Sequence, residues 1–266
     1  MGRSKAAETR RSEIAEVVAA AGFARIDELA ERFNVTPMTI HRDLDELDAR
    51  GVITKVRSGA RATPIEEIER NVQLRRNHML PEKRAIAAAA LDWLAGQGET
   101  KVVALDDSTT ALALVDDLAA RSDLTIVSNF LAVIERVAAA QAASLFALGG
   151  TLSTEFQSFL GSSTREAIAS IQIDVFFMSS TSIGRNAVFH PNEGALLVKQ
   201  ALIDQAQQSV LLMDHTKFAR RALHRLAALH EFDVVIVDDG IDPEDEEWLR
   251  SAVSQVIVAP VTEEEP

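Results

Sequence analysis

The sequence predicts an α/β protein of two domains, an N-terminal winged helix-turn-helix domain and a larger α/β domain with a mainly parallel sheet. Three observations lead to this prediction. The chain of 266 residues is too long for one small domain. Its first part places three helical patterns ahead of a short β-branched run and a glycine-containing segment. From residue 82 onward, helical segments and apolar β-branched segments alternate. We expect the first domain over residues 8–62, a linker over 63–81 and the second domain over 82–260.

The helices of the first domain follow from apolar spacing and from capping residues. Apolar residues at helical intervals predict one helix over 12–21 and a second over 27–33. Thr36 is a favourable N-cap and Pro37 suits the first helical position, so a third helix starts there and runs to about residue 50. A helix, a tight turn and a second helix form the arrangement that presents its second member to the major groove of DNA.

The third helix has one apolar face and one charged face. Ile40, Leu44 and Leu47 cluster on the core side, while Asp45 and Glu46 lie opposite and would repel phosphates. The helix must therefore approach DNA with its N-terminal end. Taken alone, this segment is also compatible with an ordinary amphipathic helix whose arginine is solvated.

A wing follows the third helix. Residues 52–56 are apolar and β-branched, residues 57–61 contain a glycine, and together they predict two short strands whose cations meet backbone phosphates. The residues expected to contact DNA come from the helix start and from this wing. They are Thr36, Met38, Thr39, His41, Arg42, Lys55, Arg57 and Arg61.

Charge is distributed unevenly along the chain, whose formal net charge is −13. Residues 1–61 contain 11 basic and 10 acidic residues, whereas the remainder contains 16 basic and 30 acidic residues. The acidity therefore belongs to the second domain, which removes an objection to DNA binding by the first domain without arguing for it. The chain has no cysteine, no apolar leader segment and no apolar run of about 18 residues. We expect a cytoplasmic protein without a membrane span.

The strands of the second domain are short and continuously apolar, which is typical of a parallel sheet that helices cover on both faces. We expect strands over 101–105, 124–128, 144–148, 174–179, 209–213, 233–237 and 255–259. Helices are expected over 82–95, 110–120 and 130–141. Ligands of such sheets bind beyond the carboxyl ends of the strands, so the loops after the strands are where we expect the site.

The loop after the first of these strands, residues 106–110, has three hydroxyls ahead of a helix and predicts an anion cradle. A simple capping turn is the alternative interpretation of this loop. No GxxxxGK[ST] pattern is present, so nucleotide hydrolysis is unsupported. Hydroxyls and lysines suit a phosphate, and carboxylates and amides suit sugar hydroxyls. The expected ligand-binding residues are Asp106, Asp107, Ser108, Thr109, Thr110, Asn129, Gly149, Gly150, Glu193, Lys199, Asp214 and Lys217.

Other chemistry finds less support in the sequence. The six histidines lack metal-ligand spacing, so we expect no metal, and no cofactor motif is present. Asp106 and Asp107 could act as an acid–base pair, so an isomerase of sugar phosphates with an accessory DNA-binding head is the alternative function.

The segment from residue 28 to residue 60 resembles the winged helix-turn-helix of the DeoR family of bacterial transcriptional regulators. The matching residues are Val35-Thr36, Thr39-Ile40, Arg42-Asp43-Leu44, Leu47, Gly51 and Gly59-Ala60. His41 departs from the family, which has an arginine there, and Arg57-Ser58 replace a His-Gly pair in the wing. The departure at His41 leaves the operator preference open.

The resemblance extends over about residues 10–258. Its later matches are Glu82-Lys83, Asp106, Thr109-Thr110, Asn129, Leu148-Gly149-Gly150, Asp214 and Lys217-Phe218, and its departures are Ser108, Ser128 and His215-Thr216. The resemblance implies an effector domain related in fold to ribose-5-phosphate isomerase and a phosphorylated sugar as effector. It also implies repression that the effector relieves. Helix-turn-helix proteins usually bind paired half-sites as dimers, so we expect a homo-oligomer, either a dimer or a tetramer.

Overall fold

The computed structural model describes residues 2–49 and 51–262. These residues form two compact units, and the boundary between them along the chain lies between His78 and Met79. Residue 50, the expected end of the third helix, and the last four residues of the acidic C-terminal tail lie outside the described residues.

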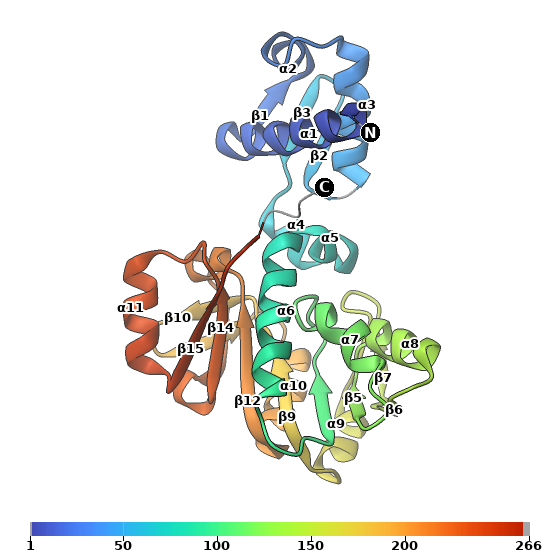
Figure 1. The fold of residues 1–266 in the computed structure, drawn as a ribbon, viewed down its shortest axis with the longest axis vertical. Coiled ribbons are helices and arrows are strands. Elements are labelled where there is room, and N and C mark those ends of the chain that lie inside the picture. Colours follow the sequence, from blue (N-terminus) through green and yellow to red (C-terminus); the bar gives the residue numbers. More distant parts are fainter. Residues whose placement is uncertain (1, 50, 263–266) are drawn as a thin grey trace. The chain divides into compact units, whose positions relative to one another are not determined.

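The first unit contains the predicted three helices and wing (Figure 1). Its elements are α1 (Gly2–Ala21), β1 (Phe23–Arg25), α2 (Ile26–Arg32), α3 (Pro37–Ala49), β2 (Ile53–Val56), β3 (Gly59–Ala62), α4 (Ile65–Glu69) and α5 (Val72–Asn77). The three strands form an antiparallel sheet in the order β1-β3-β2. Ile14, Leu29, Ile40 and Leu44 are buried together in its core.

Helices α4 and α5 occupy most of the segment that the sequence predicted to be a linker. Ile68 and Val72 are buried within an otherwise charged stretch, and the side chain of Asn71 caps α5 by accepting from two main-chain amides. Gly51 has a φ of +70°, and a Cβ at this position would fall 2.3 Å from Leu74 Cδ2. Helix α5 therefore packs directly on the turn that follows α3, and only glycine fits there.

The second unit is built on a seven-stranded sheet in the order β15-β14-β12-β9-β4-β5-β6, with every neighbouring pair parallel. Its strands are β4 (Val102–Leu105), β5 (Thr125–Ser128), β6 (Ser144–Ala147), β9 (Ile173–Met178), β12 (Ala206–Met213), β14 (Val234–Asp238) and β15 (Gln255–Ala259). All seven predicted strands are present, and the predicted parallel sheet is confirmed.

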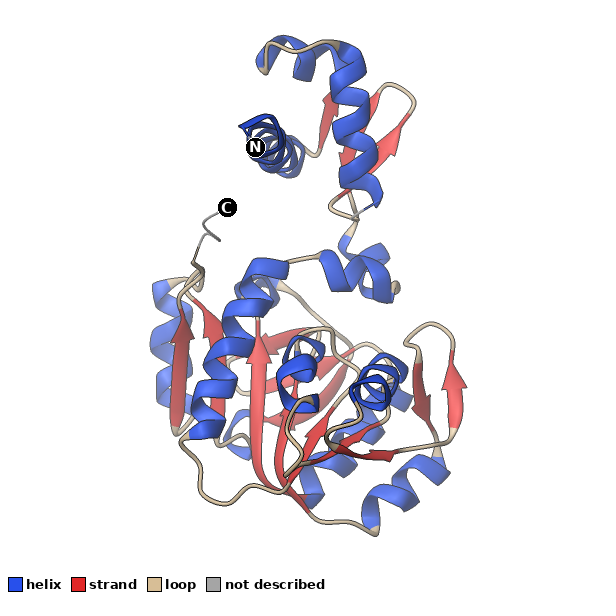
Figure 2. Cartoon of the chain, turned by 45° about the vertical axis from the view of Figure 1, so that its right-hand side comes forward, coloured by secondary structure: helices blue, strands red, loops and turns tan. Residues whose placement is uncertain are grey.

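Helical segments connect these strands and lie in front of and behind the sheet (Figure 2). They are α6 (Leu80–Ala95), η1 (Ala111–Leu114), α7 (Val115–Ala119), α8 (Leu131–Ala140), α9 (Ser162–Ala169), α10 (Glu193–Gln205), η2 (His215–Ala219), η3 (Leu229–Glu231) and α11 (Pro243–Ala252). The helix expected over 110–120 is split into a 3-10 turn, η1, and the short helix α7. None of the described helices is both long and apolar enough to span a bilayer.

Two small antiparallel sheets were not predicted from the sequence. One is a hairpin of β7 (Thr151–Ser153) and β8 (Ser158–Leu160), and the other has β10 (Ser182–Gly184), β11 (Ala187–His190) and β13 (His224–Ala228) in the order β10-β11-β13. These strands are three to five residues long. Runs so short carry too little periodicity to be distinguished from loops.

Candidate functional site

Two groups of residues are candidates for function, one in each unit. In the first unit, the start of α3 is exposed and capped. Thr36 Oγ1 accepts from the main-chain amide of Thr39 at 3.3 Å and lies 3.0 Å from Thr39 Oγ1, so the predicted N-cap is confirmed. Met38 is 63% exposed and Arg42 is exposed on the same helix, whereas Thr39 and His41 are half-buried. This helix end offers hydroxyls and a guanidinium to a partner.

A buried carboxylate fixes the orientation of α3. Asp43 accepts from Arg10 Nε at 2.7 Å and from Arg11 Nε at 3.2 Å, and it is 2% exposed. These bonds tie α3 to α1. From the sequence, Asp43 was identified only as a match to a family pattern, although its place beside the apolar face of α3 was a signal that it turns inward.

The cations of the wing differ in what they contact. Lys55 Nζ donates to Asp45 on α3 and to the carbonyl oxygen of His41. Arg61 pairs with Glu67 at 3.4 Å, and Arg57 is exposed at the tip of the wing. Lys55 therefore ties β2 to α3, and Arg61 ties β3 to α4. Neither contact was predicted from the sequence.

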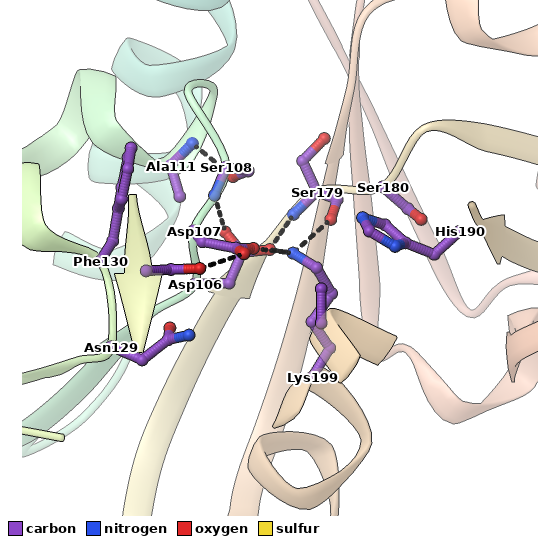
Figure 3. Close-up of polar contacts among 12 residues, drawn as sticks. Asp106, Asp107, Ser108, Ala111, Asn129, Phe130, Ser179, Ser180, His190 and Lys199 are labelled. Atoms are coloured by element: carbon purple, nitrogen blue, oxygen red, sulfur yellow. Dashed lines mark hydrogen bonds and ion pairs between the residues drawn. The ribbon is translucent and has the colours of Figure 1, made fainter. Parts of the chain in front are cut away.

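In the second unit, the polar residues after the strands form a buried cluster at the carboxyl ends of β4, β9 and β12 (Figure 3). Lys199 reaches it from α10 and places Nζ 2.5 Å from Asp106 Oδ2 and 2.8 Å from Asp107 Oδ1. Burial by itself lowers the pKa of Lys199, but the two carboxylates outweigh burial and hold that pKa above its ordinary value. Lys199 therefore stays charged and neutralises part of the charge of the two aspartates.

Each aspartate is also held by hydrogen bonds. Asp106 accepts from the main-chain amides of Ser108 and Ser179, both at 3.0 Å. Asp107 accepts from Ser158 Oγ at 3.0 Å, so the hairpin that contains β8 closes over the end of β4. With these partners, both carboxylates remain fixed despite their burial.

A second lysine and a third carboxylate adjoin this cluster through Ser179. Lys217 Nζ donates to Ser179 Oγ at 2.7 Å and lies 3.6 Å from Asp214 Oδ2. Burial raises the pKa of Asp214, but Lys217 and a hydrogen bond from Thr216 overcome that effect and bring the pKa to about 2. Asp214 and Lys217 thus form an ion pair at the same rim of the sheet.

The hydroxyl loop and the next strand end contain two buried oxygens that have no hydrogen-bond partner within the described part of the chain. Thr109 Oγ1 accepts from Lys83 Nζ at 3.0 Å, but Thr110 Oγ1 has no partner. Asn129 donates through Nδ2 to the carbonyl oxygen of Phe159, while its Oδ1 has no partner. Buried polar atoms are seldom left in this state, so both oxygens are positioned to meet a ligand.

Glu82, at the start of α6, adds a third buried oxygen of this kind. Its Oε2 has no partner, and burial raises the pKa of Glu82, with Asp238 and Asp214 acting in the same direction. Glu82 and Lys83 were identified from the sequence as part of a motif, but neither residue was predicted to belong to the site. Their position at the start of α6, close to the strand ends, makes both candidates.

Three predicted residues lie outside the cluster. Gly149 and Gly150 are exposed in the turn between β6 and β7. Gly150 has a φ of +147°, and a Cβ there would fall 2.1 Å from Thr164 Oγ1, so this glycine serves the turn. Glu193 is exposed in the first turn of α10, and no hydrogen bond or ion pair among the described residues joins it to the cluster. The remaining nine predicted residues are buried at this rim.

Three partners within the cluster were missed by sequence reasoning: Lys83, Ser158 and Ser179. Ser179 is the last residue of a predicted strand and follows the observed strand β9, so its place at a strand end was an available signal. Ser158 lies in a hairpin that was not predicted. Among the described residues, no group of three or more histidines or carboxylates is arranged to hold a metal ion.

Comparison with known proteins matches both units to one family. Residues 10–66 match the DeoR-like helix-turn-helix domain, and residues 79–239 match the DeoR C terminal sensor domain. The uncharacterized HTH-type transcriptional regulator YgbI of Escherichia coli is 32% identical over 87% of this chain and 90% of its own length. The lactose phosphotransferase system repressor of Staphylococcus epidermidis is 28% identical over 93% of this chain and 98% of its own length.

Among solved structures, D-ribose-5-phosphate isomerase in complex with phospho-erythronic acid matches at 14% identity over 52% of this chain and 53% of that chain. The TM-score is 0.38, which supports no conclusion about chemistry.

Proposed function

The chain belongs to the DeoR family of transcriptional regulators, and from that premise we propose that it represses genes of carbohydrate metabolism until a phosphorylated sugar binds to its second unit. The first unit is the DNA-binding head. The second unit is the sensor. A sugar phosphate changes operator affinity only as far as it binds the two DNA-binding states unequally.

The head supports this function through the exposed start of α3. Arg42 lies on the helix face opposite the buried Ile40 and Leu44, and the fixed Asp43 points the other way. A guanidinium that contacts a guanine with two hydrogen bonds contributes about 1–3 kcal/mol of discrimination. His41 stands beside it, so the operator preference is expected to differ from that of relatives with two arginines.

The observation that carries the sensor proposal is the pair of buried oxygens, Thr110 Oγ1 and Asn129 Oδ1, on neighbouring strand ends. Leaving a buried polar atom unpaired costs about 1–3 kcal/mol, so a ligand with hydroxyl groups recovers free energy by donating to both oxygens. The ammonium groups of Lys83 and Lys217 lie on the same rim and suit a phosphate. This combination fits a sugar phosphate better than a neutral sugar.

The alternative, a sugar-phosphate isomerase with an accessory head, finds no support in the relatives, whose names are those of transcriptional regulators and repressors. Asp107 would be its acid–base residue. Asp107 is bonded to Lys199 and Ser158, and these bonds hold its carboxylate in place. We expect the protein to bind sugar phosphates without turning them over.

Repression requires access to chromosomal DNA, so we place the protein in the cytoplasm. Two heads on paired half-sites, one helical turn apart, imply a homo-oligomer.

DNA binding is tested with the full chain and promoter fragments from its own locus. We expect Arg42→Ala to lower operator affinity by roughly 10- to 100-fold, because one base or phosphate contact is lost. Arg121→Ala is the matched control, since Arg121 is a surface arginine of the second unit that pairs only with the nearby Asp123. Equal affinities of both variants in a gel-shift titration would reject the role of Arg42.

Effector sensing is tested with Thr110→Val, which removes the unpaired hydroxyl and keeps the shape. A panel of sugar phosphates is first screened by thermal shift, and the best binder is titrated against the protein–operator complex. We expect Thr110→Val to raise the effector concentration for half-release by roughly tenfold. Thr125→Val, at the opposite end of the neighbouring strand β5, is the control. Normal release by the Thr110 variant would mean that the ligand binds elsewhere.

A further inference from the structure

The seven-stranded sheet has two edges, β15 and β6, and only one of them is protected (Figure 1). Free sheet edges invite pairing with another chain, so proteins usually guard them with charge, proline or a covering segment. At the β15 edge, Arg250 Nη1 donates to the carbonyl oxygen of Val256 at 3.1 Å, and Pro260 follows the strand. The acidic helix α11 packs beside it.

The β6 edge has none of these devices. No charged residue and no proline occurs between Arg136 and Glu155, a stretch that includes all of β6 and β7. Phe146 is 40% exposed and Leu152 is 45% exposed in this stretch. Among the residues that the structure describes, β6 has a strand neighbour only on its β5 side. An exposed apolar edge of this kind indicates an interaction surface.

The hydrogen bonds between β5 and β6 identify the main-chain groups that face outward. The amide of Ser144 donates to the carbonyl oxygen of Leu124, and the amide of Leu148 donates to that of Ser128, both at 2.9 Å. Main-chain direction alternates along a strand, so the N–H and C=O groups of Leu145 and Ala147 point away from β5. The free edge therefore offers two donors and two acceptors, placed symmetrically about Phe146.

We propose that a second copy of this chain binds here, with β6 pairing antiparallel to β6 of the partner around a two-fold axis at Phe146. Leu145 then exchanges two hydrogen bonds with Ala147 of the partner subunit, and the symmetry repeats this pair. The two Phe146 side chains lie directly opposite each other, where aromatic pairs stabilise antiparallel strands. The result is one continuous sheet through both sensor units.

Charge favours a second copy as the occupant. Residues 62–266 contain 30 acidic and 16 basic residues, so two sensor units repel each other through most of their surfaces. The uncharged stretch from Val137 to Thr154 is where two identical acidic bodies can approach without facing like charges. The proposed function gives an independent reason to expect a second copy, because paired half-sites require two heads. The inference rests on the proposed function in this respect alone.

The experiment measures the mass of the full chain in solution without DNA or effector, by light scattering and sedimentation over a range of concentrations. We expect Phe146→Glu and Phe146→Lys each to lower the apparent mass to half that of the wild type, because like charges then face each other across the axis. An equimolar mixture of the two variants should recover the wild-type mass, because glutamate now faces lysine. Recovery also shows that both variants fold.

A second pair of variants tests the edge without adding charge. Ala147→Pro removes an outward N–H and should raise the dissociation constant of the dimer by at least roughly tenfold, since two intermolecular hydrogen bonds are lost. Val258→Pro makes the same change at an outward position of β15 and should leave the dimer intact. Circular dichroism checks the fold of both.

A wild-type chain that is monomeric at all concentrations would overturn the inference, and so would Phe146 variants that keep the wild-type mass. A mixture that stays dissociated would overturn the two-fold axis at Phe146. None of these outcomes depends on operator binding by the head or on effector binding by the sensor. The inference and the proposed binding functions can therefore fail separately.

Discussion

In the first unit, Met38 and Arg42 project from the start of α3 into solvent, whereas in the second unit Asp106, Asp107 and Lys199 are buried against one another. Both groups were predicted to bind a charged partner. The phosphate backbone of DNA is densely charged, so exposed cations of the head can remain solvated until phosphates become their partners. A small metabolite must be enclosed, so we expect its site to combine buried ion pairs that fix the geometry with buried oxygens, Thr110 Oγ1 and Asn129 Oδ1, that have no hydrogen-bond partner among the described residues.

The difference extends to the role of ion pairs. In the head, the buried pairing of Asp43 with Arg10 and Arg11 ties α3 to α1 and thereby supports the face that we propose to contact DNA. In the sensor, the ion pairs belong to the site itself. Mutations in the sensor cluster should therefore alter stability and sensing together, while in the head these effects should be separable.

The largest expected effect is that of Lys199→Met, which leaves the carboxylates of Asp106 and Asp107 buried without their cation. We expect the free energy of unfolding of the sensor unit to fall by about 3–5 kcal/mol. Urea denaturation followed by circular dichroism measures it. Arg136→Met removes an exposed cation paired with Asp116 and should change stability by no more than about 0.5 kcal/mol. Equal stabilities of the two variants would contradict the expectation that the buried ion pairs contribute more to stability than the exposed one.

A smaller effect is expected in the head. Asp43→Asn replaces a buried carboxylate that accepts from two arginines and should cost about 1–3 kcal/mol of stability. Operator affinity should fall as well, because α3 loses its fixed orientation on α1. Asp45→Asn changes an exposed carboxylate on the same helix and keeps an oxygen that can accept from Lys55, so it should leave stability nearly unchanged, with DNA binding equal or stronger. Equal operator affinities of the Asp43 and Asp45 variants would contradict a role of Asp43 in orienting α3.

The pH dependence of stability sharpens the comparison further. The pKa of Asp214 is about 2 in the folded protein, against an ordinary value of 3.8. A lowered folded pKa means that the stabilisation is present above about pH 4 and is lost as the pH falls through about 2, and it amounts to roughly 2 kcal/mol. The stability gap between the wild type and Asp214→Asn should therefore be constant from pH 7 to about 5 and then shrink. Urea titrations at several pH values measure the gap, and a gap that widens on acidification would contradict the pairing of Asp214 with Lys217.

The sequence predicted the three helices and the wing of the head, because their signals are local. Thr36 and Pro37 mark the start of α3, Ile40 and Leu44 define its buried face, and Gly51 marks its end. Caps, helical periodicity and turn glycines act over a few residues, so they can be identified before the fold is known. The seven strands of the parallel sheet were predictable for the same reason.

By itself, the sequence thus determined the elements, their order and the strand ends at which a ligand site should lie. Only the tertiary structure decided which of those residues meet. Lys199 and Asp106 are 93 positions apart, and their contact depends on how α10 crosses the sheet. Ser158 reaches Asp107 through a hairpin with no clear periodicity, and Glu193 faces solvent although it lies on the same helix as Lys199. The physical reason is that side chains from distant elements are brought together by packing in three dimensions, which no local pattern records.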